Sequence, residues 1–233
     1  MERTKTACPL PDAAGLLDGI PAQRGTSPAT PAPSRRPPIP FTLGYGAVLA
    51  ATSLFTAYAD PGVVHRLLQG SSTDVAHLLR APLFVLPASA LWVAGGLLSP
   101  FSVGFLLVLG ALERRVGGVR AAAVFLFGHV VATLATEVPV GFAVLVGHLP
   151  GSSLHRMDYG ISFGVATSLG ALTGLLRPWL RWPLLALFTA MLLQDLVAFR
   201  DPLSDWGHLI ALALGVAAWP AVRRWRAAGR GIR

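Results

Sequence analysis

Long stretches without charged residues alternate with short polar segments over most of this chain. A helix that crosses a membrane needs roughly 20 mostly apolar residues, and only structures with internally satisfied backbones survive in lipid. With interfacial flanks, most of the apolar stretches reach that length. They are residues 41–59, 81–112, 121–136, 159–176, 182–194 and 206–222. The pattern predicts one all-helical membrane domain over residues 41–222, with six transmembrane helices.

The boundaries of five spans follow from their flanking residues. They are expected at about 41–59, from Arg120 to Glu137 or beyond, and at about 159–176, 179–198 and 205–222. The remaining stretch is too long for one simple helix, because residues 81–112 carry no charge and are interrupted by Pro87 and Pro100. We expect an irregular, membrane-embedded segment over about 81–97, followed by the second span, which ends at Leu112. Irregular backbone at that depth requires cover by protein or water.

The positive charges predict the orientation of the six spans. If the N-terminus is cytoplasmic, 15 of the 19 Lys and Arg residues fall on the cytoplasmic side, and four, Arg66, Arg80, Arg156 and Arg200, fall outside. Cytoplasmic loops of membrane proteins carry such an excess. Both termini are therefore expected in the cytoplasm. The net charge of +8 comes from residues beside spans, so it indicates a lipid bilayer as partner and no nucleic acid.

Both ends of the chain lie outside the predicted membrane domain. Residues 1–40 contain nine of the 19 prolines and no apolar period, which predicts a disordered, Pro-rich cytoplasmic tail. Residues 223–233 are expected to form a basic cytoplasmic tail. The single cysteine, Cys8, excludes a disulfide framework. Few lysines beside many Arg, Ala and Gly residues are typical of a high-GC bacterium, so we expect a bacterial plasma membrane.

Two reactive side chains stand at the heads of predicted spans. Ser162 begins the fourth span and His208 the sixth, and the topology puts both near the outer surface. Small residues follow each at helical spacing, and small residues let membrane helices approach closely. They are Ala166, Gly170 and Gly174 after the serine, and Ala211, Gly215 and Ala218 after the histidine. We therefore expect spans four and six to touch, with Ser162 facing His208.

Such a pair has the chemistry of a serine hydrolase. His208 would act as general base toward Ser162 and then protonate the leaving amine. The helix N-terminus at Ser162 would place N–H groups and a positive dipole end near a developing oxyanion, and Gly160 would let a substrate backbone approach. Alternatively, a serine or histidine at these places only packs or bonds at a helix interface.

Four motifs in this order resemble those of the rhomboid intramembrane serine proteases. Gly160-Ile161-Ser162, with Gly170 eight residues after the serine, resembles the serine segment of the family, and Gly207-His208 with Gly215 resembles its histidine segment. The segment 110–117, GALERRVG, resembles the family's Glu-Arg motif between two glycines at the turn from the second helix to the third, and 77–82 resembles the start of the embedded first loop. The resemblance implies a six-helix rhomboid fold, a Ser162–His208 dyad and no cofactor or metal.

The sequence departs from the rhomboid pattern at the expected oxyanion site. The family usually carries His and Asn four residues apart in the second helix, and those positions fall near Leu97 and Phe101. The residue after the serine is usually glycine but is Phe163 here. Loss of one oxyanion donor costs about 10²–10³ in rate. Two readings therefore stay open: a protease that cleaves transmembrane substrates, and an inactive rhomboid-like protein that binds transmembrane clients.

Further polar residues are candidates for supporting roles. His129, Thr133 and Glu137 share one face of the third span, and ionisable groups inside a membrane often mark function. These residues would replace the missing oxyanion donors, or they would form a proton path. A proton path would fit a third reading, a small carrier. Alternatively, His129 only bonds a neighbouring helix and holds the bundle together. Asp158 precedes Ser162 by four residues and Asp205 precedes His208 by three. Either could orient its neighbour, although helix capping is the simpler role.

Overall fold

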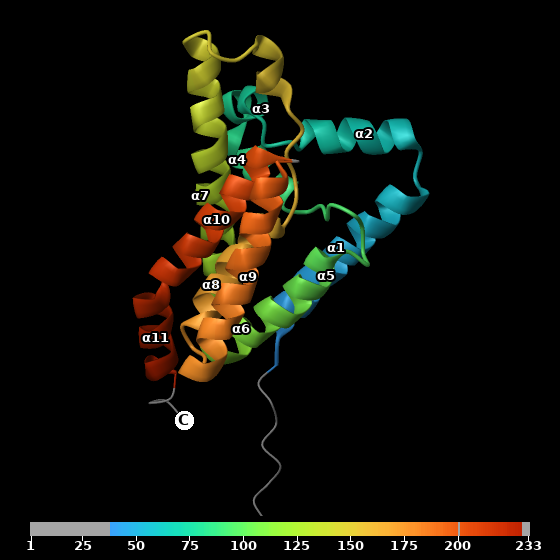
Figure 1. The fold of residues 1–233 in the computed structure, drawn as a ribbon. Helices are drawn as coiled ribbons and strands as arrows, with labels where there is room; N and C mark the ends of the chain where they lie inside the picture. Colours follow the sequence, from blue (N-terminus) through green and yellow to red (C-terminus); the bar gives the residue numbers. More distant parts are fainter. Residues whose placement is uncertain (1–37, 200, 230–233) are drawn as a thin grey trace, which may run out of the picture. The chain divides into compact units, whose positions relative to one another are not determined.

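The computed structural model describes residues 38–199 and 201–229, and every regular element in those ranges is helical. The predicted disordered tail, apart from its last three residues, and Cys8 lie outside the described residues. The first helix, α1 (Pro40–Tyr58), opens the membrane domain at the predicted place. Figure 1 shows the helices of this domain, with α7, α8, α9 and α10 running side by side.

The N-terminus of α1 is held by a buried glutamate from far along the chain. Glu113, in α6 (Gly110–Val116), accepts hydrogen bonds from the backbone N–H groups of Phe41 and Thr42 at 2.9 and 2.7 Å, and from the Thr42 hydroxyl at 2.6 Å. A carboxylate here satisfies N–H groups that the helix itself leaves unpaired. The glutamate of the GALERRVG segment therefore joins the first and second spans. The helix α6 ends at Gly117, whose φ of +91° favours glycine.

Short helices fill the segment between the first two spans. They are α2 (Pro61–Gly70), α3 (Val75–Arg80) and α4 (Pro82–Ser89), and turns follow as far as Ser99. Asp60 and Asp74 cap α2 and α3. The helix α2 has no buried residue and projects away from the other helices (Figure 1). The irregular segment predicted over about 81–97 is found only from Ala90 onward, because residues 82–89 form α4. The separate helix α2 was not expected from the sequence.

The segment predicted as the second span begins after these turns and is interrupted by a wider helical turn. It comprises α5 (Pro100–Gly104), the π-helical η2 (Phe105–Leu109) and α6, without a break. Phe105 and Leu109 are buried in the main core, where Phe105 packs edge-to-face on Tyr45 and Phe125. The span continues to Val116, beyond the predicted end at Leu112.

Long helices make up the second half of the domain. They are α7 (Gly118–Leu145), α9 (Pro178–Ala198), α10 (Pro202–Ala217) and α11 (Trp219–Ala228), with the short α8 (Ser162–Thr173) among them; the 3₁₀ turn η3 (Gly151–His155) precedes α8. In the described ranges α1, α7 and α9 are long and apolar enough to cross a membrane, and a fourth is gained if α10 and α11, bent by 44°, count as one. Length alone therefore yields three or four spans rather than six.

The helix α8 forms the centre of the domain. Every residue from Phe163 to Leu175 is buried, and α7 and α10 cover it on two sides. Glycines permit this contact, because a Cβ on Gly128 of α7 would lie 2.0 Å from the Thr167 hydroxyl oxygen. A Cβ on Gly164 would lie 2.4 Å from the ring of Phe125. A helix enclosed in this way meets little lipid, and its 12 residues extend only about 18 Å, less than the roughly 30 Å of a bilayer's hydrocarbon core.

The C-terminus of α8 lies at the end of the domain where arginines collect, which we call the basic end. Arg181 at the start of α9 and Arg223 and Arg226 in α11 bond the carbonyl oxygens of residues 173–176. Cations near the negative end of a helix dipole are stabilising. The predicted basic tail from residue 223 is therefore corrected in part, because α11 continues to Ala228 and uses its arginines to bind α8.

Candidate active site

The helices α8 and α10 run in the same direction, in contact along their whole common length. The Thr167 hydroxyl donates to the carbonyl of Ala211 at 2.8 Å. A Cβ on Gly215 would lie 2.1 Å from the Thr167 carbonyl oxygen, and a Cβ on Gly170 only 2.5 Å from that of Leu212. The expected contact between these helices is confirmed, and its closest points are the two glycines of the predicted small-residue faces.

This register puts Ser162 and His208 at one level. Phe163 faces Gly207 and Thr167 faces Ala211, so positions 44 apart in the chain are opposite each other. His208 therefore stands opposite residue 164, two positions from Ser162, which corresponds to about 3 Å along the helix axis. Ser162 begins α8, and His208 lies in the second turn of α10, each in the half of its helix away from the basic end. The structure thus supports the equal depth that the sequence predicted.

Ser162 is the first residue of α8, and it is half-buried. Among the described residues no side chain caps it, so the first N–H groups of α8 lack the partner that capping would supply. Gly160, with φ of +132°, turns the chain into the helix. Its N–H donates to the carbonyl of Ser89 at 3.0 Å. The N–H of Gly160 is thus occupied in fixing the loop. The N–H groups that follow Ile161 point toward the N-terminus of α8, where Ser162 lies.

Phe163 lies between the serine and the histidine helices. Its ring packs edge-to-face on the His208 ring with centroids 5.1 Å apart. The side chain is 6% exposed, and the Cα of Gly207 leaves the space that the ring fills. Ala132, Ala166 and Ala211 complete this small cluster. The departure from glycine is therefore accommodated by the packing of α7, α8 and α10, and Phe163 fixes one face of the imidazole.

His129 is bound to the short helix α4. Its Nε2 lies 3.0 Å from the carbonyl oxygen of Leu86 and 3.1 Å from the Ser89 hydroxyl. With the carbonyl as acceptor, Nε2 carries the proton. The Ser89 carbonyl in turn holds Gly160. His129 therefore connects α7 to α4, and the bond from Gly160 to Ser89 connects α4 to the loop before Ser162. This agrees with the alternative in which His129 bonds a neighbouring helix.

Glu137 belongs to a second connection, at the same end of α7. Its buried carboxylate accepts a hydrogen bond from Arg156 at 2.6 Å, and Arg156 also lies 3.5 Å from Asp201. Arg156 comes from the loop before α8, and Asp201 caps α10 by accepting from the N–H of Ser204. The pair thus links α7, the loop and α10. Thr133, between His129 and Glu137, is fully buried, and its hydroxyl has no partner among the described residues.

Neither of the two aspartates caps the helix that carries the neighbouring reactive residue. Asp158 is not on α8, because the helix begins only at Ser162. It instead bonds Thr73 through its carboxylate and accepts the N–H of Thr73 at its carbonyl. Asp205 lies in the first turn of α10, but the cap is Asp201, because that helix starts at Pro202. The sequence missed this start because Pro202, at the first position, was assigned to a loop.

The expected second-helix donors are absent at the positions counted from the family pattern. Leu97 lies in the turns before α5 and is 45% exposed, and Phe101 belongs to α5. Ser89, Arg156 and Asp201 are site-supporting residues that the sequence did not indicate. Their partners lie 19 to 45 positions away in the chain, and no short spacing could have revealed them.

Comparison with known proteins agrees with the geometry. Residues 36–228 match a family described as rhomboid-like protein. No curated protein and no solved structure gives a match. The match spans all the helices described above and both reactive residues. The all-helical membrane domain, with Ser162 at the head of α8 and His208 in the second turn of α10, therefore belongs to the rhomboid-like family.

Proposed function

We propose that this protein is an intramembrane serine protease that cleaves transmembrane segments near their outer ends. In this proposal the six spans are α1, the continuous α5–η2–α6, α7, α8, α9 and the bent pair α10–α11. Both termini are cytoplasmic, as the distribution of arginine favours. The basic end then faces the cytoplasm, and Ser162 lies near the outer surface of a bacterial plasma membrane.

The register of α8 and α10 is the observation that carries the proposal. Backbone contact at Gly170 and Gly215 fixes the two helices against each other. About two turns toward their N-termini, the same register places Ser162 and His208 at one level. Close packing of α8 on α10 requires small residues at the contact, but it does not require a serine and a histidine at one level. This pair therefore supports a chemical role. A nucleophile and a base at one level, beside the half-buried start of a helix, support this proposal, because acyl transfer needs both groups close to the reacting carbonyl.

The reaction follows from these positions. His208 takes the proton of the Ser162 hydroxyl, whose oxygen attacks the scissile carbonyl carbon to form a tetrahedral intermediate. As the intermediate collapses, the C–N bond breaks and His208 protonates the leaving amine. Water, activated by the same imidazole, then hydrolyses the acyl-serine. The uncapped N–H groups at the start of α8 stabilise the oxyanion, aided by the helix dipole.

In this proposal backbone donors replace the side-chain donors that Leu97 and Phe101 cannot supply. The N–H of Gly160 is occupied by Ser89, so the donors are those of Ser162 and the residues directly after it. A site with fewer donors is expected to be slower, by about 10²–10³ for each donor lost. His129 acts as a positioning residue, because it holds Ser89 and through it the loop that carries Ser162.

A catalytically inactive, client-binding protein is the second candidate. The observation that favours it is the Phe163 ring, which packs on His208 at a position where the family usually has glycine. A bulky side chain there narrows the space beside the imidazole. Such a protein would bind transmembrane segments through its apolar helices without cutting them.

Proteoliposomes that contain a library of single-span peptides distinguish the two candidates. The protease is expected to generate peptide fragments, detected by mass spectrometry, with cleavage sites near one end of the span. Ser162→Ala should abolish the fragments, and Ser168→Ala, which removes a buried hydroxyl from the same helix, should not. Peptides that co-purify with the protein uncut would instead support the inactive candidate.

A further inference from the structure

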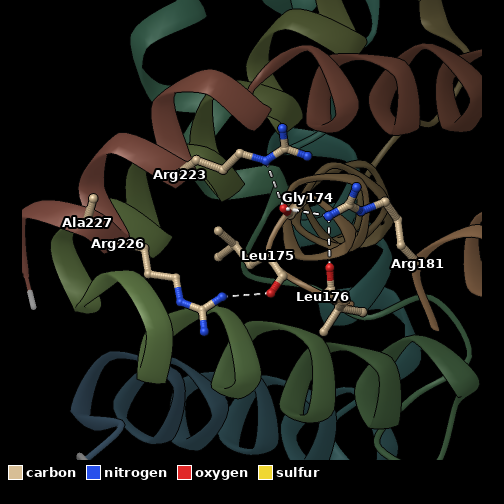
Figure 2. Close-up of a pocket in the computed structure, with 7 residues that line it drawn as sticks. All are labelled: Gly174, Leu175, Leu176, Arg181, Arg223, Arg226 and Ala227. Carbon is tan, nitrogen blue, oxygen red and sulfur yellow. Dashed lines mark hydrogen bonds between the residues drawn. The ribbon is translucent and has the colours of Figure 1, made fainter. Parts of the chain in front are cut away.

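Three guanidinium groups surround one pocket at the basic end. Figure 2 shows Arg181 from α9 and Arg223 and Arg226 from α11 around the carbonyl groups that end α8. The pocket holds about 280 Å³, enough for a phosphate group with part of its substituents. Neither the proposed catalysis nor the packing of α8 with α10 uses this pocket.

The arginines are fixed before any ligand arrives. Arg223 donates from Nε to the Gly174 carbonyl at 3.0 Å, and Arg181 donates to the Thr173 and Leu176 carbonyls at 2.9 and 2.8 Å. Both guanidinium groups also stack on Trp219, each 5.0 Å from its ring. Trp219 itself donates to the Gly170 carbonyl at 2.8 Å. Groups held in place in this way lose little freedom on binding.

The pocket carries a large excess of positive charge. The negative end of the α8 dipole offsets only about half a unit charge, and none of the pocket-lining residues is acidic. Arg181 and Arg223 have no carboxylate partner within the described part of the chain. Each guanidinium has five N–H donors. In Arg181 and Arg223 only some of these donors are bound to carbonyl oxygens. A planar donor array of this kind suits phosphate oxygens.

We propose that this pocket binds the phosphate of an anionic phospholipid. A phosphate diester would supply the negative charge that Arg181 and Arg223 do not find in a carboxylate of the described residues, and further acceptor oxygens for their remaining N–H groups. The lipid is the favoured source because the pocket lies where transmembrane helices end and interfacial tryptophans collect. A second basic pocket, which includes Arg114, Arg115 and Arg120, shares Arg226 with it and extends the same positive surface. The bound lipid would then hold α8, α9 and α11 together.

Native mass spectrometry of the purified full chain in detergent tests the site. Phosphatidylglycerol is titrated against phosphatidylcholine, and the lipid-bound fraction is measured. Arg223→Gln is expected to weaken phosphatidylglycerol binding about tenfold or more, since a hydrogen bond to a charged group is lost. Arg224→Gln is the matched control, because Arg224 carries the same charge on the same helix but does not line the pocket; it should leave binding nearly unchanged.

A second variant tests the pocket without removing any bond to α8. Ala227 lines the pocket and is exposed, so Ala227→Glu places a carboxylate there and should also weaken binding, whereas Ala228→Glu should not. Equal weakening by Arg223→Gln and Arg224→Gln, or by the two alanine variants, would overturn the proposal in favour of diffuse attraction. Displacement of the lipid by equimolar glycerol phosphate would overturn the lipid as occupant and identify a soluble phosphate ester.

Discussion

His129 and Thr133 share one face of α7 but differ in their hydrogen bonds: His129 is bonded through Nε2, whereas its Nδ1 and the Thr133 hydroxyl have no partner within the described residues. His129 is 2% exposed and has two polar partners at its Nε2, in α4. Thr133 is fully buried and its hydroxyl has no partner within the described residues. A buried polar group contributes to stability only if it is hydrogen-bonded. At the residue scale, therefore, only the histidine of this pair supports the fold around the active site.

His129→Ala should lower the free energy of unfolding by about 1–3 kcal/mol, because it leaves the Leu86 carbonyl and the Ser89 hydroxyl with fewer partners. The measurement is denaturation in detergent followed by circular dichroism. Thr133→Val is the control and should be neutral or stabilising, since it replaces an unsatisfied hydroxyl by a methyl group. An unchanged stability of His129→Ala would show that its two contacts contribute nothing to the fold.

Helical spacing was sufficient to put His129, Thr133 and Glu137 on one buried face, but not to find their partners. The position of Ser89 depends on how α4 folds back against α7, which no pattern in residues 81–97 specifies. Charge counting predicts only that Arg156 lies on the outer side. Its contact with Glu137 could not be predicted, because it depends on the path that the loop before α8 takes. Local periodicity identifies faces, and tertiary structure identifies contacts.

The contact of α8 with α10 dominates the element scale. Glycine at positions 170 and 215 lets the two backbones approach within a distance that no side chain permits. Packing of this kind replaces hydrophobic burial as the force between helices in lipid. The same contact sets the depth of Ser162 relative to His208, so its loss should affect stability and activity together.

Gly215→Ala should destabilise the protein by about 1–3 kcal/mol, the usual cost of overpacking, because the new Cβ would lie 2.1 Å from the Thr167 carbonyl oxygen. Thermal unfolding in detergent measures the effect. Gly44→Ala in α1 is the matched control, since no atom lies within 4 Å of its Cβ. Equal melting temperatures for the two variants would contradict the close approach.

The ion pair between Glu137 and Arg156 can be tested by a double-mutant cycle. Arg156→Ala alone should cost about 3 kcal/mol, because it leaves the buried Glu137 carboxylate unpaired. The double variant Glu137→Gln/Arg156→Ala should be more stable than Arg156→Ala, since the unpaired charge is gone. Additive effects in the cycle, measured by chemical denaturation, would mean that the two residues do not interact.

The whole molecule combines features that the sequence predicts well with features that it does not. Charged flanks and apolar length located α1, α9 and the start of α7 within a few residues, whereas α7 continues to Leu145, eight residues beyond Glu137. The rhomboid-like family and the packing of α8 on α10 were confirmed. The projecting α2, the π-helical turn η2 and the helix α11 were missed. Each depends on tertiary contacts, as in α11, where arginines expected in a solvated tail bond the end of α8.

The proposed topology predicts which ends of the domain face outward. In a Cys8→Ser background, a membrane-impermeant maleimide applied to intact cells should label His148→Cys, which is exposed after α7. It should not label Ala228→Cys, which is exposed at the basic end, until the cells are permeabilised. Labelling of Ala228→Cys in intact cells would reverse the orientation and place the serine near the cytoplasm.

Reaction of Ser162 with a fluorophosphonate probe tests the central claim of a His208-activated serine most directly. In detergent the wild-type protein should be labelled covalently at Ser162. Ser162→Ala should abolish the label, and His208→Ala should slow it about 100-fold or more, as loss of a general base predicts. Ser168→Ala, on the same helix, should react like the wild type. An absence of labelling in a wild-type protein that remains folded, or equal labelling of Ser162→Ala, would contradict the protease.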